Sequence, residues 1–195
     1  MQNTWVVVPV GSREKYLDSL IETLSEYRGR IVFVNNDTNY SIFDGVHHIE
    51  DFGEINISRW WNTGIDFAKQ NGAEYVAVIN DDIYFDPSLI SEMVLEMEKG
   101  NYEVSSAMGN LGVFWIIKTS SEIRADETLR WWCGDGDIFR EAKIVGKLLN
   151  YKTSKLVHLE HNLQTSESDY LTKLGNEDLK RYRAKLERLG QLENW

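Results

Sequence analysis

The sequence has one cysteine, two prolines and a deficit of positive charge. The single cysteine, Cys133, can form neither an intramolecular disulfide nor a cysteine-based zinc site. The 31 acidic residues outnumber the 21 basic residues, which gives a formal net charge of -10 at pH 7. This balance argues against nucleic-acid binding through bulk charge, because a phosphate backbone attracts a basic surface. The remaining composition, with 42% hydrophobic residues, is typical of a globular protein.

Long apolar runs are also missing. No stretch approaches the roughly 20 apolar residues that a membrane-spanning helix needs. The opening "MQNTWVVVPVG" lacks the basic segment and the long apolar run of a signal peptide. We therefore expect a cytoplasmic protein with no membrane span. A chain of 195 residues is long enough to bury a core of its own.

Apolar runs rich in Val and Ile alternate with segments of helical periodicity over the first half of the chain. The expected strands are residues 4–10, 30–37, 47–52, 74–79, 103–108, 112–118 and 155–160. The expected helices are residues 11–27, with Ser12 as a candidate N-cap, then 57–72, 86–100, 137–149 and 176–190. Such alternation predicts an α/β fold, in which a mixed, mainly parallel sheet is flanked by helices. Ligands of such sheets bind beyond the carboxyl ends of the strands.

The last helix is amphipathic, with Leu179, Tyr182, Leu186 and Leu189 on one stripe. We expect a main domain over residues 1–165 and a C-terminal helical extension, 166–195, packed on it. The apolar stripe could equally serve as the contact of a homodimer.

Three polar residues, Asn80, Asp81 and Asp82, follow the buried run of residues 74–79 directly. Two adjacent carboxylates are costly to bury unless a cation compensates them. Their oxygens are hard ligands that suit Mg²⁺ or Mn²⁺, and these ions often take substrate phosphates as further ligands. The alternative is that the two carboxylates only cap the following turn or helix.

Six segments, in this order, resemble those of the GT-A-fold glycosyltransferases of the large family 2 type. They are "PVGSREKYLDSLIETL", "VNND", "WWNTGIDFAKQNGAEYVAVINDDIYFDPSLI", "GVFWIIKTSSEI", "WWCGDGDIFREAKIVG" and "KLVHLEH". The resemblance covers most of residues 4–161 and implies a GT-A-like, Rossmann-like fold. It also implies a hexosyltransferase type of enzyme that uses a nucleoside-diphosphate sugar, with UDP-sugars favoured.

The resemblance assigns donor and metal contacts to individual positions. The nucleotide-sugar contacts it implies are Pro9, Arg13, Asp37, Asn62, Asp81 and Trp115. Asp82 matches the last Asp of the DXD-type motif and should be the main ligand of Mn²⁺ or Mg²⁺. Asn80 stands where many relatives carry Asp, so the strict D-x-D pattern is absent. His158 matches a late metal-binding His, with His161 as its rival, because residues three apart on a strand face opposite sides.

The resemblance places the catalytic base at Asp135, although Gly134 stands where the family has Glu. A base that takes the acceptor proton while the hydroxyl attacks the anomeric carbon predicts an inverting transferase. Trp132 and Asp137 should lie on the acceptor side, with an N-cap as the alternative for Asp137. In each pair of adjacent tryptophans we expect one side chain in the core and the other at the acceptor site.

The acceptor could be a glycan, a small molecule or a modified nucleic-acid base. A non-catalytic module that binds a nucleotide sugar or a glycan is the main alternative, because Asn80 and Gly134 depart from the family pattern. A sugar-nucleotide pyrophosphorylase fits poorly, because the first strand is not followed by a Gly-rich loop. A phosphatase motif of the D-x-D-G-T kind is absent, as are Walker A and Rossmann fingerprints.

Overall fold

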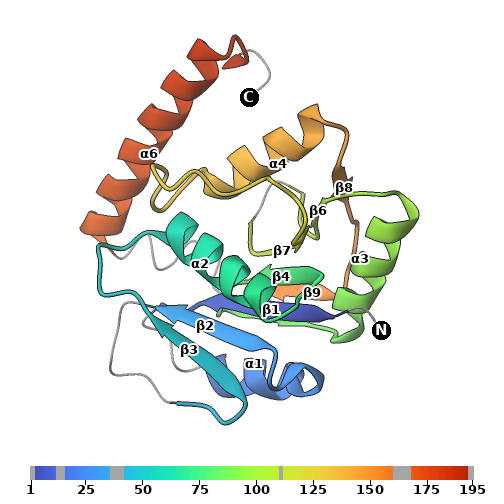
Figure 1. Ribbon diagram of the computed structural model, residues 1–195. Helices are drawn as coiled ribbons and strands as arrows, with labels where there is room; N and C mark the ends of the chain where they lie inside the picture. The colour runs from blue at the N-terminus through green and yellow to red at the C-terminus, as the bar shows by residue number, and fades with distance from the viewer. Residues whose placement is uncertain (1–2, 12–15, 36–41, 110–111, 160–167, 193–195) are drawn as a thin grey trace.

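The structure of the protein is a computed structural model, which describes residues 3–11, 16–35, 42–109, 112–159 and 168–192. A seven-stranded sheet in the order β3-β2-β1-β4-β7-β6-β8 forms its centre, with helices on both faces (Figure 1). This arrangement confirms the predicted α/β class with a mixed, mainly parallel sheet.

Four strands form the parallel part of the sheet: β1 (Thr4–Pro9), β2 (Ile31–Asn35), β3 (Val46–Glu50) and β4 (Tyr75–Ile79). β1, β2 and β4 are buried along their whole length. Burial on both faces explains their continuous apolar sequences, because helices cover both sides of a parallel sheet. The carboxyl ends of these strands therefore meet at one edge.

The other three strands are β7 (Phe114–Lys118), β6 (Val104–Ser106) and β8 (Leu148–Asn150). β7 is antiparallel to β4 and to β6, whereas β8 is parallel to β6. The prediction that residues 148–149 end a helix is wrong. Gly146, at a φ of 70°, lies between the preceding helix and β8, and this left-handed conformation favours glycine.

Helices cover the two faces of the sheet in pairs. α1 (Leu17–Thr23) and α3 (Ser88–Lys99) bury their apolar stripes on one face, in the core that contains Phe33. α2 (Ile57–Gln70) and α4 (Gly134–Ile144) cover the other face. A short 3-10 helix, η2 (Ser25–Tyr27), follows α1.

Asn56 is the N-cap of α2, because its side chain accepts a hydrogen bond from Arg59 N at 3.0 Å. The candidate N-cap Ser12 lies outside the described residues.

A separate two-stranded sheet forms next to the carboxyl end of β4. β5 (Ile83–Phe85) begins directly after Asp82, outside the main sheet, and pairs antiparallel with β9 (Leu156–His158). In this register Ile83 is opposite His158. The small sheet therefore brings two segments more than 70 residues apart in the chain to one place.

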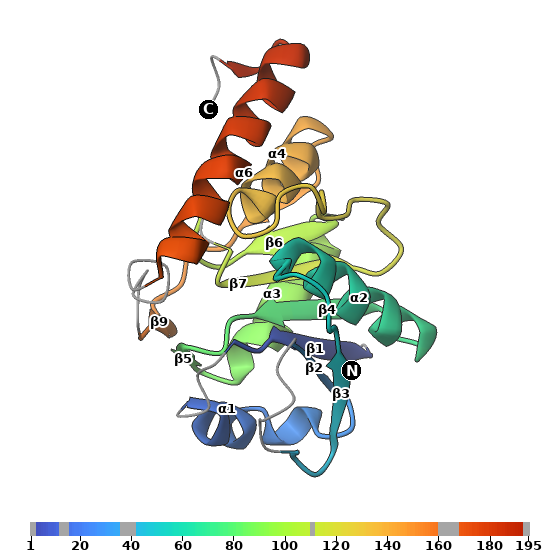
Figure 2. The same cartoon turned by 90° about the vertical axis from the view of Figure 1, so that its left-hand side faces the viewer.

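The C-terminal helix α6 (Asp169–Arg188) begins earlier than the predicted start at residue 176. Its N-cap is Ser168, whose side chain accepts from Leu171 N at 3.2 Å. Figure 2 shows α6 alongside α4, and Tyr182 and Leu186 pack there with Leu129. In the described part of the chain, no helix is both long enough and apolar enough to cross a lipid bilayer.

Candidate active site

The carboxyl ends of β1 and β4 meet through Asp81. Its Oδ2 accepts a hydrogen bond from the backbone N–H of Gly11 at 2.9 Å. Asp81 and Asp82 are both buried, with exposures of 7% and 8%. On the other side, the backbone N–H of Asn80 donates to the carbonyl oxygen of Val113 at 2.9 Å. Asn80, Asp81 and Asp82 therefore lie between the end of β1 and the start of β7.

Asp82 faces His158 across the small sheet. The His158 Nε2 atom lies 3.2 Å from each carboxylate oxygen of Asp82. The backbone N–H of Leu159 donates to the Asp82 carbonyl at 2.9 Å, which continues the pairing of β5 and β9. The fold thus brings together the two residues predicted as metal ligands. The rival His161 lies outside the described residues.

The donor atoms of this pair suit a hard divalent ion. Carboxylate oxygen is the preferred protein ligand of Mg²⁺ and Mn²⁺, and imidazole nitrogen is a common ligand of transition metals. Among the described residues, no group of three or more His, Cys, Asp or Glu side chains could hold a metal. Two protein ligands still fit Mg²⁺, which keeps several waters and takes oxygens from substrate phosphates.

Asp135 lies in the first turn of α4, where acidic side chains are favourable. Its Oδ2 accepts from the backbone N–H of Gly112 and its Oδ1 from that of Gly136, both at 2.8 Å. Burial raises the pKa of the Asp135 carboxyl above its ordinary value of 3.8, and the two N–H donors offset this only in part. Gly112 directly precedes Val113, the partner of Asn80. The two residues before β7, Gly112 and Val113, therefore link the candidate base to the segment that carries the candidate metal ligands.

Two glycines allow the close approaches that build this region. A Cβ atom on Gly112 would overlap the side chain of Asp135, and a Cβ on Gly134 would overlap Ser58 Oγ on α2. The packing of α4 against α2 thus gives a physical reason for glycine at position 134. Cys133, the N-cap of α4, has a φ of 68°, an uncommon conformation outside glycine. Burial raises the pKa of the Cys133 thiol to about 11, so it stays protonated near neutrality.

The structure gives Asp137 a different role from the predicted acceptor contact. Its side chain is 1% exposed and forms ion pairs with Arg140 at 2.8 Å and with Lys185 of α6 at 2.6 Å. Lys185 also pairs with Asp126 at 2.8 Å. The Asp137 carboxylate is therefore directed at α6 and holds that helix against α4. The alternative as N-cap is also wrong, because Cys133 occupies that position.

Two of the predicted donor contacts are directed elsewhere. Trp115 is fully buried between α2 and α4, with its ring edge-on to Trp61 at 5.6 Å, so the prediction is corrected to a core residue. The Asn62 carboxamide donates to Ala125 O at 3.0 Å and accepts from Ala125 N at 3.1 Å. It also donates to Glu127 Oε1 at 2.9 Å, so this side chain holds the segment before α4.

Pro9 lies buried at the end of β1, next to the strand ends that carry the acidic residues. Arg13 and Asp37, the predicted contacts to the nucleotide, lie outside the described residues.

Sequence analysis missed two residues of α6 that support the segment leading to Asp135. Asp178 is fully buried, and its Oδ2 accepts from the backbone N–H groups of Trp131 at 2.5 Å and Trp132 at 3.0 Å. The Trp132 ring lies against Gly175, where any Cβ atom would overlap it. The sequence feature that could have indicated them is a Gly and an Asp on the apolar face of an amphipathic helix, where large apolar residues are expected. Trp132 is half-buried two residues before Gly134.

Comparison with known proteins identifies the fold. No known family model matches the sequence, and no curated protein matches it. Among solved structures, glucosyl-3-phosphoglycerate synthase from Mycobacterium tuberculosis with Mg²⁺ and uridine diphosphate aligns with a TM-score of 0.68 and 12% identity. That alignment covers 97% of this chain and 80% of the synthase.

Two further structures extend the likeness. S. aureus TarS, residues 1–349, aligns at a TM-score of 0.60 and 13% identity, covering 94% of this chain and 72% of that one. A putative nucleotide-diphospho-sugar transferase from Desulfovibrio desulfuricans G20 aligns at 0.56 and 10% identity, covering 93% and 99%. At these identities the likeness is one of fold. The chain therefore has the GT-A-like fold of nucleotide-diphospho-sugar transferases.

Proposed function

We propose that the protein is a metal-dependent, inverting glycosyltransferase of the hexosyltransferase type. It would transfer a sugar from a nucleoside-diphosphate sugar, with a UDP-sugar favoured, to an acceptor hydroxyl. The observation that carries the proposal is the meeting of Asp82 and His158, 3.2 Å apart beyond the carboxyl end of β4. The UDP in the M. tuberculosis synthase structure supports the choice of nucleotide.

The donor would bind at the edge formed by β1 and β4. Asp82 and His158 would hold Mn²⁺ or Mg²⁺, which supplies compensation for the charge that develops on the diphosphate leaving group. Asp81 fixes the end of β1 by accepting from Gly11 N and would lie next to the ribose and phosphates of the donor. Pro9, the last residue of β1, would lie at the same edge of the donor site.

Asp135 would act as the general base. Its raised pKa improves it for this task, because a stronger base takes a hydroxyl proton more readily near the working pH. The N–H groups of Gly112 and Gly136 hold the carboxylate in one orientation. One direct displacement, with the acceptor oxygen opposite the leaving diphosphate, inverts the anomeric centre.

The test is a panel of nucleotide sugars with Mn²⁺, followed by thermal shift, by release of nucleoside diphosphate and by NMR of the first sugar anomer formed. We expect one UDP-hexose to stabilise the protein and to be turned over with inversion. Asp82→Ala should lose metal-dependent binding, whereas Asp135→Asn should bind the donor and lose turnover by about 10²-fold or more.

Asp18→Asn, on the exposed side of α1, is the matched control for both variants and should behave as wild type. Binding of a nucleotide sugar with no turnover towards any acceptor would favour the non-catalytic module instead. No binding of any nucleotide in the presence of metal would overturn both.

A further inference from the structure

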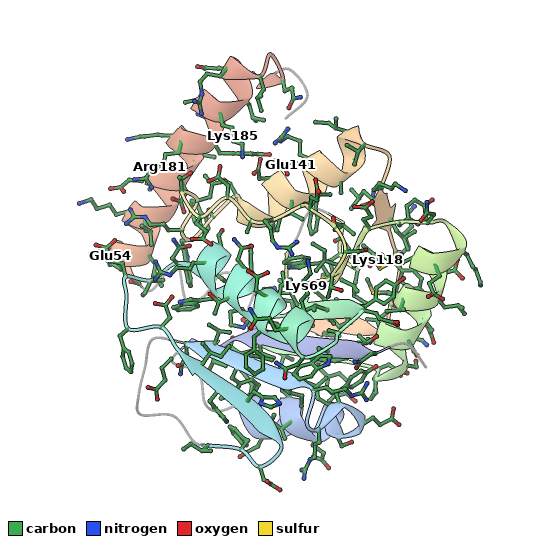
Figure 3. All side chains as sticks on the ribbon, in the orientation of Figure 1. Glu54, Lys69, Lys118, Glu141, Arg181 and Lys185 are labelled. Atoms are coloured by element: carbon green, nitrogen blue, oxygen red, sulfur yellow. The ribbon has the colours of Figure 1, made fainter. Side chains whose placement is uncertain are left out.

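A cavity of about 600 Å³ lies between α4, β8 and α6, away from the candidate metal ligands. Figure 3 labels Lys185 on α6, whose ammonium pairs with Asp137 of α4 at 2.6 Å. One wall is a stripe of α4 with the spacing of a single helix face, formed by Gly136, Phe139, Arg140 and Lys143.

The cavity begins at the residue that follows the candidate base. A Cβ atom built on Gly136 meets no other atom within 4 Å, so there is open space directly above this helix position. The backbone N–H of the same residue donates to Asp135 Oδ1 at 2.8 Å. Cys133, on the other side of Asp135 in the chain, also lines the cavity. A molecule in the cavity therefore lies next to the turn of α4 that carries Asp135.

The walls combine apolar surface with one available cation. Phe139, Tyr182 and Leu186 are almost fully buried and present ring or aliphatic surface. The Arg140 guanidinium is already compensated, because it pairs with Asp137 and donates to Gln191 Oε1 at 2.7 Å. Lys143 is exposed and forms no ion pair with any described residue, so its ammonium can meet an anion.

We propose that this cavity binds the acceptor and selects an anionic molecule with an apolar or aromatic ring and a hydroxyl group. The inference rests on the proposed function. The ring would pack on Phe139 and Tyr182, the anion would face Lys143, and the hydroxyl would pass Gly136 towards Asp135. The hydroxyl oxygen forms the bond to the anomeric carbon, the bond from that carbon to the diphosphate oxygen breaks with its electron pair, and Asp135 takes the hydroxyl proton.

A fluorescent probe, 6-hydroxynaphthalene-2-sulfonate, carries all three features and serves as both ligand and test acceptor. We expect the wild type to bind it at one site and, with a UDP-sugar and Mn²⁺, to glycosylate it. Gly136→Leu should weaken probe binding by about tenfold or more, because the side chain fills the cavity. Since this helix position has open space and leucine favours helices, the melting temperature should not fall.

Asn176→Leu, an exposed position of α6, is the matched control and should keep the wild-type affinity for the probe. Lys143→Glu should weaken binding by about threefold, with the naphthol lacking the sulfonate unaffected. UDP affinity, measured separately, should be the same in Gly136→Leu and wild type.

The cavity assignment would be overturned if Gly136→Leu and the wild type bound the probe equally, or if the wild type did not bind it. Binding of UDP by the wild type would then leave the proposed function standing. If Gly136→Leu abolishes probe binding but the wild type does not bind UDP, the cavity binds the probe without being an acceptor site. That result would overturn both the acceptor role and the proposed function.

Discussion

Two pairs of buried carboxylates lie in different parts of the molecule and have different partners. In the C-terminal pair, Asp137 and Asp178 contact Arg140, Lys185 and Arg181, all permanent cations near neutrality. In the strand-end pair, Asp81 meets a backbone N–H and Asp82 meets an imidazole.

The difference indicates what each pair is for. Permanent cations compensate the charge of the first pair within the protein itself, so we assign these carboxylates to holding α6 on the domain. Asp82 and His158 of the second pair offer carboxylate oxygen and imidazole nitrogen, which are ligands of divalent ions, so we assign this pair to the proposed metal site. Four variants test this division, and a pH profile tests the candidate base Asp135 beside it.

The largest effect on stability should come from Asp178→Ala. The change leaves the buried N–H groups of Trp131 and Trp132 without their acceptor, which costs about 2–5 kcal/mol of unfolding free energy. Urea denaturation measures it, with Asp169→Ala at the exposed start of α6 as control. UDP affinity of the folded fraction should be unchanged. A loss of UDP binding without loss of stability would contradict a structural role for this pair.

The next effect should come from Asp82→Ala. We expect the affinity for UDP in the presence of Mn²⁺ to fall by about 100-fold, since a metal ligand is lost. In the absence of metal, the unfolding free energy should change far less than in Asp178→Ala. Calorimetric titration of UDP with and without Mn²⁺ separates the two contributions. Equal UDP affinity in both proteins with metal would remove the distinction between the two carboxylate pairs.

We expect pH to have a smaller effect on kcat/KM, through the protonation of Asp135. The base acts in its deprotonated form, so kcat/KM is full above the pKa of Asp135 and falls about tenfold per pH unit below it. Because the pKa lies above 3.8, this fall should begin at a higher pH than an ordinary aspartate would give. A pH profile of kcat/KM measures the acidic limb. A limb centred at or below pH 3.8 would contradict the role of burial.

The fold and part of the site could be predicted from local patterns. Continuous β-branched runs indicated β1, β2 and β4, and their polar ends indicated Asp81 and Asp82. The predictions that were wrong concern residues whose roles depend on contacts between distant segments. β7 is buried on nearly all of its length, so nothing in its sequence distinguishes a core Trp115 from one that faces a ligand. The roles of Asp137 and Asp178 depend on where α6 docks, which no local pattern specifies.

The smallest effect should come from Asp126→Asn, which removes the outer partner of Lys185 at 2.8 Å. Both side chains are partly exposed, so water screens the pair, and we expect a loss of at most about 1 kcal/mol of unfolding free energy. Lys185→Met, in contrast, removes a cation from the buried Asp137 and should cost about 3 kcal/mol. Urea denaturation of the two variants measures the ratio. Equal costs would mean that the burial of Asp137 does not set the strength of this contact, and the C-terminal pair would then not be the anchor of α6.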